Sequence, residues 1–171
     1  MKRNILSKIY TIAITLAFVL GEIVIFLAQG DDSTGMVFVL IGILLSFILA
    51  PTVHELGHII FAKREKMQIQ YAKFFCFSIQ RVGGRYALKI VNPFLADQTQ
   101  AVPIGRENMK TRAQKYTIGG LIFSATFTAV IVLFAVVLKM ANVENALALG
   151  LLPYSAYLFL LNAVPFEYAD G

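Results

Sequence analysis

The chain has 171 residues, of which 58% are hydrophobic, and its mean hydropathy is +0.72. Soluble domains average nearer half apolar, so this composition indicates a membrane protein with little room for a separate soluble domain. A single cysteine, Cys76, excludes an intramolecular disulfide and a paired-cysteine metal site. The net charge of +5 comes without a nucleic-acid recognition motif, so we expect no nucleic acid as a partner.

Four apolar segments are long enough to cross about 30 Å of hydrocarbon, which takes about 20 helical residues. They cover residues 9–28, 36–62, 116–138 and 146–164. The first could be a cleaved signal peptide, but its apolar core exceeds the usual length of about 7–15 residues and favours an uncleaved anchor. We therefore expect an all-α polytopic membrane protein, a single membrane-embedded core over residues 1–171, with the lipid bilayer as a partner.

Basic residues are distributed unevenly around these segments. Of the fifteen, three precede the first span, eleven lie between the second and third, and only Lys139 follows the third. By the positive-inside rule, the N-terminus and the loop over residues 63–115 are cytoplasmic. We expect an integral multi-pass protein of a prokaryotic cell membrane whose basic span ends contact anionic headgroups. The oligomeric state is left open.

The second span contains the run His54-Glu55-Leu56-Gly57-His58, which holds both histidines of the chain. Residues four apart share a helix face, so both imidazoles can bind one metal ion. Glu55 lies about 100° around the helix, where it can act on a water molecule without being a ligand. This pattern is typical of zinc hydrolases. The alternative is a hydrogen-bonded histidine pair, which the cost of ionisable groups at membrane depth disfavours.

The central loop carries two segments, residues 71–80 and 86–91, that are rich in aromatic and β-branched side chains. A loop with Gly83 and Gly84 separates them, which predicts a cytoplasmic-side β-hairpin within residues 68–92. Its phenylalanines suggest that it lies on or dips into the membrane beside the histidines. An edge strand there could hold an extended substrate by strand addition, or the hairpin could simply shield the site.

A catalytic zinc ion usually has three protein ligands and a water molecule. Because no third histidine exists, the remaining ligand has to be a carboxylate. The fourth span returns to the side where His54 and His58 lie and ends in the run Asn162 to Gly171. Asp170 and Glu167 are the two candidate ligands in that run.

The HELGH run, paired with N-x-x-P-x-x-x-x-D-G over residues 162–171, resembles the site-2 protease family of intramembrane zinc metallopeptidases. The resemblance implies one zinc ion per chain, held by His54, His58 and Asp170, with Glu55 as the catalytic base. It also implies that Asn162 assists the binding of the substrate or transition state.

Gly119-Gly120 is similar to the family's G-P-x-x-N patch. Leu121 replaces the proline and Ser124 takes the asparagine position, so we predict no role for it. The expected function is intramembrane proteolysis of transmembrane segments or signal-peptide remnants by a zinc metalloendopeptidase. The alternative is an inactive membrane scaffold or immunity protein that retains a zinc site. A metal transporter is disfavoured, because the third span carries only Ser and Thr as polar side chains.

Overall fold

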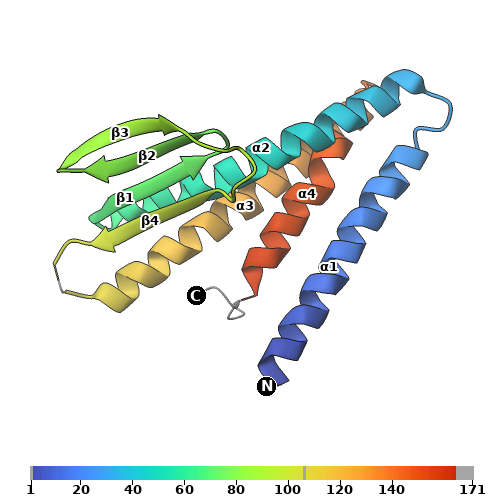
Figure 1. The fold of residues 1–171 in the computed structure, drawn as a ribbon. Helices are drawn as coiled ribbons and strands as arrows, with labels where there is room; N and C mark the ends of the chain where they lie inside the picture. Colours follow the sequence, from blue (N-terminus) through green and yellow to red (C-terminus); the bar gives the residue numbers. More distant parts are fainter. Residues whose placement is uncertain (1, 106, 165–171) are drawn as a thin grey trace. The chain divides into compact units, whose positions relative to one another are not determined.

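The computed structural model of the chain describes residues 2–105 and 107–164 (Figure 1). These residues form four helices, each long and apolar enough to cross a membrane, and one four-stranded sheet. The helices are α1 (Lys2–Leu27), α2 (Ser33–Arg64), α3 (Met109–Met140) and α4 (Ala146–Ala163). The four expected helices are thus confirmed, and α2 and α3 continue past the expected spans into charged residues. Lys, Arg and Gln are good helix formers, so a helix need not end where the apolar run ends.

The helices expose many of their large aliphatic side chains. Leu27, Leu44 and Leu133 are 68%, 67% and 64% exposed, respectively. Water would oppose so much exposed apolar surface, whereas hydrocarbon does not. The arrangement therefore fits a membrane protein.

The sheet lies between α2 and α3 in the sequence, as predicted. Its strands are β1 (Met67–Phe74), β2 (Phe77–Val82), β3 (Arg85–Ile90) and β4 (Gln98–Pro103), all antiparallel in the order β3-β2-β1-β4. The predicted hairpin corresponds to β2 and β3, joined through Gly83 and Gly84, which both have positive φ. Glycine adopts this conformation without the strain that a side chain would bring.

One detail of the predicted hairpin is wrong, and one strand of the sheet was not predicted. Residues 71–80 do not form one strand, because the chain reverses between Phe74 and Phe77 and divides the segment into β1 and β2. Phe75 takes a φ of 48° in this turn, and no glycine, proline or asparagine marks it in the sequence. β4 was not predicted, since its run QTQAVP has few β-branched or aromatic residues.

The chain forms two compact units, and α2 and α3 each continue from one into the other. The first unit takes the described part of Met1–Phe47 and Phe127–Gly171. In it, a Cβ added to Gly150 of α4 would overlap the Val39 backbone of α2, so these two helices touch at their backbones. The Phe18 ring of α1 lies 5.7 Å from the Tyr154 ring, measured between centroids.

The second unit, Ile48–Thr126, contains the sheet, the end of α2 and the start of α3. Here α2 and α3 meet at Gly57 and Gly119, where a Cβ on Gly57 would overlap the Gly119 carbonyl oxygen. Ala62, Met67 and Ala72 are buried in this unit. His54, Glu55 and His58 all belong to this unit.

Candidate metal centre

One face of α2 brings His54 and His58 together, with Glu55 beside them. The two Nε2 atoms lie 3.2 Å apart, and ligand atoms of all three residues lie within 4.8 Å of one another. His54 and Glu55 are only 8% and 7% exposed. The three residues form a group that could hold a metal ion.

Helix α3 orients both imidazole rings through their other nitrogens. His54 Nδ1 lies 2.8 Å from the Ser124 hydroxyl oxygen, and His58 Nδ1 lies 2.9 Å from the Tyr116 carbonyl oxygen. Because a carbonyl oxygen only accepts, His58 Nδ1 donates the hydrogen and its Nε2 keeps a lone pair. Hydrogen bonds of this kind fix the ring orientation of metal-binding histidines.

Gly120 makes room for these rings on α3. A Cβ added there would overlap His58 Nε2 and would lie 2.8 Å from His54 Cε1. Its neighbour Gly119 faces Gly57, where an added Cβ would lie 2.8 Å from the Gly57 carbonyl oxygen. One glycine thus lets α3 approach α2, and the other leaves space for the imidazoles.

Neither this glycine pair nor Ser124 was predicted to have a role. The structure places both Gly120 and Ser124 against His54, with Ser124 one helical turn after the glycine. A glycine and a hydroxyl residue four positions apart share a helix face, and that spacing is the signal that could have found them.

The carboxyl group of Glu55 is buried next to β4. The Thr99 side chain of β4 lies beside it, and the Tyr116 hydroxyl donates a hydrogen bond to the Thr99 carbonyl oxygen. Within residues 2–105 and 107–164, Glu55 Oε2 has no hydrogen-bond partner. A buried carboxylate oxygen without a partner is costly, so this atom is suited to take a proton or a polar ligand.

The donor geometry agrees with a tetrahedral zinc ion. Zinc–nitrogen bonds of about 2.0–2.1 Å at the tetrahedral angle place two nitrogen ligands about 3.3–3.4 Å apart. The observed separation of the Nε2 atoms is 3.2 Å, and both Nδ1 atoms are already engaged elsewhere. Without a metal ion, the same separation would allow a hydrogen bond from His54 Nε2 to His58 Nε2.

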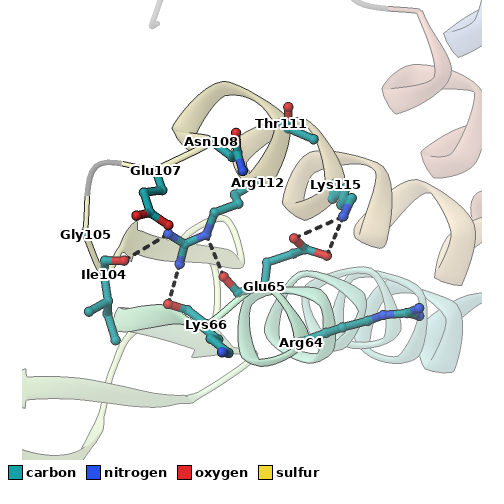
Figure 2. Close-up of a pocket in the computed structure, with 10 residues that line it drawn as sticks. All are labelled: Arg64, Glu65, Lys66, Ile104, Gly105, Glu107, Asn108, Thr111, Arg112 and Lys115. Carbon is teal, nitrogen blue, oxygen red and sulfur yellow. Dashed lines mark hydrogen bonds and ion pairs between the residues drawn. The ribbon is translucent and has the colours of Figure 1, made fainter.

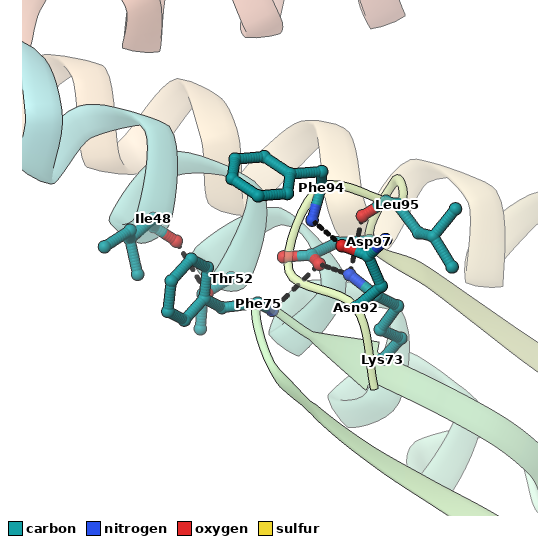
Figure 3. Close-up of polar contacts among 8 residues, drawn as sticks. All are labelled: Ile48, Thr52, Lys73, Phe75, Asn92, Phe94, Leu95 and Asp97. Carbon is teal, nitrogen blue, oxygen red and sulfur yellow. Dashed lines mark hydrogen bonds and ion pairs between the residues drawn. The ribbon is translucent and has the colours of Figure 1, made fainter. Parts of the chain in front are cut away.

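A buried ion pair anchors the segment that leads into β4 (Figure 3). Lys73 Nζ of β1 donates to Asp97 Oδ1 at 2.9 Å and to the Leu95 carbonyl oxygen at 2.6 Å. The same Asp97 oxygen accepts the Phe75 amide at 2.8 Å. The pair thereby fixes the chain two residues before Thr99, which lies beside Glu55. No feature of the sequence predicted this contact.

The other predicted site residues belong to the first unit or lie outside the described residues, so their roles stay predictions. Asn162 belongs to α4 in the first unit, where its Nδ2 donates to the Leu158 carbonyl oxygen of its own helix at 2.8 Å. Asp170 and Glu167, the two candidate carboxylate ligands, lie outside the described residues. The third ligand therefore stays a prediction.

Comparisons of the chain with models of protein families, with curated proteins and with solved structures find no match. The resemblance to the site-2 protease family consequently stays a prediction from the two motifs. What the chain can do has to follow from the chemistry of the site itself.

Proposed function

We propose that the protein is a zinc metallopeptidase that cleaves peptide bonds within or next to the membrane. The observation that supports it most is the paired imidazoles. Their Nε2 atoms lie 3.2 Å apart beside a carboxylate oxygen that has no partner among the described residues, within a helix apolar enough to span a bilayer. Ionisable groups at such positions are costly and are usually retained for function.

In this proposal His54, His58 and Asp170 hold one zinc ion per chain. The bound ion would supply Lewis acidity that polarises the substrate carbonyl and makes water a stronger acid. Glu55 accepts the proton from the attacking water and passes it to the leaving amine nitrogen. Asn162 donates to the developing oxyanion. Ser124 and the Tyr116 carbonyl keep both imidazoles in place.

The proposed substrates are transmembrane segments or signal-peptide remnants, which have to unwind locally before a carbonyl can be attacked. β4 is an edge strand of the sheet, and its Thr99 lies beside Glu55. A substrate strand added to β4 would therefore run past the catalytic carboxylate. If β4 instead only shields the site, substitutions along its edge will not change which peptide bond is cut.

The hairpin of β2 and β3 is proposed to contact the bilayer. Phe77 pairs with Ile90 and Ile79 with Leu88, so these four side chains share one face of the sheet. All four are exposed, from 37% for Ile79 to 82% for Ile90. An apolar face of this kind suits a lipid surface better than water.

The sheet is proposed to face the cytoplasm, and Cys76 provides a test because it is the only cysteine. This residue lies in the turn between β1 and β2 and is partly exposed. A membrane-impermeant maleimide should label it in inside-out vesicles and not in right-side-out vesicles. A Cys76→Ser, Asp31→Cys variant should show the reverse, because residue 31 lies in the loop between α1 and α2. Labelling of Cys76 from the outside would overturn the orientation.

The experiment that tests the proposed function uses the purified full chain, reconstituted with a model transmembrane peptide. Cleavage is followed by mass spectrometry, with and without a zinc chelator. Glu55→Gln should keep about one zinc per chain and lower the cleavage rate by at least about 100-fold. The matched control is Glu65→Gln, an equivalent change at the residue that follows the same helix, where the side chain pairs with Lys115. A Glu55→Gln variant that cuts normally would eliminate the mechanism.

The ligand assignment has its own measurement. His54→Ala should strongly reduce the zinc content per chain, measured by elemental analysis of the purified protein. Unchanged zinc in this variant would refute His54 as a ligand, whatever the cleavage result.

A membrane scaffold or immunity protein with a retained zinc site is the second candidate. The departures of Leu121 and Ser124 from the family patch favour it. It predicts one zinc per chain, no cleavage of any offered peptide, and no functional difference between the wild type and Glu55→Gln.

A further inference from the structure

A pocket of about 500 Å³ lies in the second unit, where the ends of α2 and β4 meet the start of α3 (Figure 2). Cavities of this size commonly hold small molecules or their polar groups. None of the residues lining it belongs to the candidate metal centre. The pocket is therefore a separate site from the candidate metal centre.

Positive charge outweighs negative charge in the pocket lining. The ionisable lining residues are Arg64, Lys66, Arg112, Lys115, Glu65 and Glu107. Lys115 Nζ lies 3.1 Å from a carboxylate oxygen of Glu65, so these two charges offset each other. Among the described lining residues, three cations then remain against the carboxylate of Glu107.

Arg112 fixes one of these charges in the pocket wall. Its guanidinium donates to three backbone carbonyl oxygens, from Nε to Glu65 at 2.7 Å, from Nη1 to Ile104 at 2.9 Å and from Nη2 to Lys66 at 2.5 Å (Figure 2). All three acceptors are neutral, so no acid in these bonds cancels the charge of Arg112. The guanidinium is held rigidly and stays electropositive.

Arg64 and Lys66 supply cations that are not committed to other contacts. Both side chains are exposed, and neither makes a hydrogen bond or an ion pair through its charged group within the described ranges. The start of α3 adds backbone donors, because its first backbone bond runs from the Arg112 amide to the Asn108 carbonyl. The amides of residues 109–111 therefore lack acceptors inside the helix, and such amides favour anions.

The pocket also lies at a suitable depth for lipid. The apolar run of α2 ends at Ala62, and charged residues follow from Lys63 up to the pocket. α3 begins at Met109 with a polar first turn before its own apolar run. If these helices cross the bilayer, the pocket lies level with the phosphates of one leaflet, where anionic lipids attract basic residues.

We propose that this pocket binds a phosphate group, carried by the headgroup of an anionic phospholipid or by a soluble phosphate compound. Arg64 and Lys66 contact the phosphate oxygens, and Arg112 contributes its fixed charge from the wall. This site is independent of the proposed peptidase function and would exist in an inactive scaffold as well.

The test measures binding of phosphatidylglycerol to the full chain in phosphatidylcholine nanodiscs, with inorganic phosphate as a competitor. Arg64→Gln with Lys66→Gln should weaken binding by about tenfold or more. Lys8→Gln with Lys139→Gln is the matched control, because it removes two exposed lysines of the first unit that do not line the pocket, and it should change binding by less than about twofold. Equal losses in the two double variants would show attraction to overall charge and overturn the proposal, as would a failure of both lipid and phosphate to bind.

The competition arm separates the two sources of phosphate. Displacement of the lipid by inorganic phosphate would show that a soluble phosphate suffices, whereas lipid binding that resists it would assign the site to the headgroup.

A variant that gains binding provides a check that misfolding cannot imitate. Glu107→Gln removes the carboxylate that, among the described lining residues, opposes these cations, and it should tighten binding by about threefold. Unchanged or weaker binding would contradict the proposal.

Discussion

Both units bury serine hydroxyls in apolar helices, but the hydroxyls have different hydrogen-bond partners in the two units. In the first unit, Ser46 and Ser155 are 0% and 1% exposed, and each donates to a carbonyl three residues earlier in its own helix. In the second unit, Ser124 is 3% exposed and its hydroxyl meets the imidazole of His54 on another helix. A hydroxyl that donates within its own helix satisfies only its own hydrogen-bonding capacity. A hydroxyl that contacts an imidazole also orients that ring as a metal ligand.

Glycine shows the same contrast between the units. Gly150 in the first unit lets two backbones touch, since its added Cβ would overlap Val39. Gly120 in the second unit faces two side chains instead, the imidazoles of His54 and His58. The same small residue therefore packs helices in one unit and makes room for the imidazoles of the candidate metal centre in the other.

The largest expected effect concerns the buried charges of the second unit. Asp97→Ala would leave the ammonium of Lys73 unpaired at 2% side-chain exposure, so we expect a loss of about 3–5 kcal/mol in the free energy of unfolding. The double variant Lys73→Met with Asp97→Leu removes both charges and should recover most of that loss. Chemical denaturation in detergent, followed by circular dichroism, measures both. Equal stability of the single and double variants would contradict a role for the pair.

The second-largest expected effect distinguishes the roles of Gly120 and Gly150. Gly120→Ala should push the imidazoles apart and weaken zinc binding on the order of 100-fold, measured by competition with a chelator of known affinity. Gly150→Ala is the matched control in the first unit, and it should lower the unfolding temperature while leaving zinc affinity unchanged. If both variants lose stability and neither loses zinc affinity, Gly120 is a packing residue like Gly150.

A smaller effect is expected for the serines. Ser124→Ala removes the hydroxyl group that contacts His54 Nδ1 and should weaken zinc binding by about tenfold. Ser155→Ala removes a hydroxyl buried to the same degree but bonded within its own helix, so zinc affinity should not change. Ser124→Thr keeps a hydroxyl at this position and should restore part of the affinity. A normal affinity in Ser124→Ala would mean that Ser124 does not orient His54.

The parts of the structure that could be predicted from the sequence are those with a strong local signal. Long apolar runs predicted the four helices, and the glycine pair Gly83-Gly84 predicted the β2–β3 turn. The turn at Phe75 was missed because an aromatic run favours a continuous strand and carries no residue typical of turns. β4 was missed because its pairing with β1 is a contact across more than twenty residues, which no local pattern encodes.

The same distinction holds for the candidate site. The spacing of His54 and His58 gives their shared face directly, because helical periodicity decides it. Their partners on α3 depend on where that helix approaches α2, and that contact is set by Gly57 and Gly119. Lys73 and Asp97 are separated by a loop and two strands, so their pairing depends on tertiary folding alone.

The smallest effect compares two tyrosines whose hydroxyl groups both donate to a backbone carbonyl. Tyr116 donates to Thr99 in the second unit, and Tyr10 donates to Leu160 at 2.5 Å in the first. Replacing either with phenylalanine removes one hydrogen bond and should cost about 1 kcal/mol in the free energy of unfolding. Only Tyr116→Phe loosens β4 beside Glu55, so only this variant should also slow peptide cleavage. Equal cleavage rates in the two variants, at equal losses of stability, would mean that β4 does not position the carboxylate.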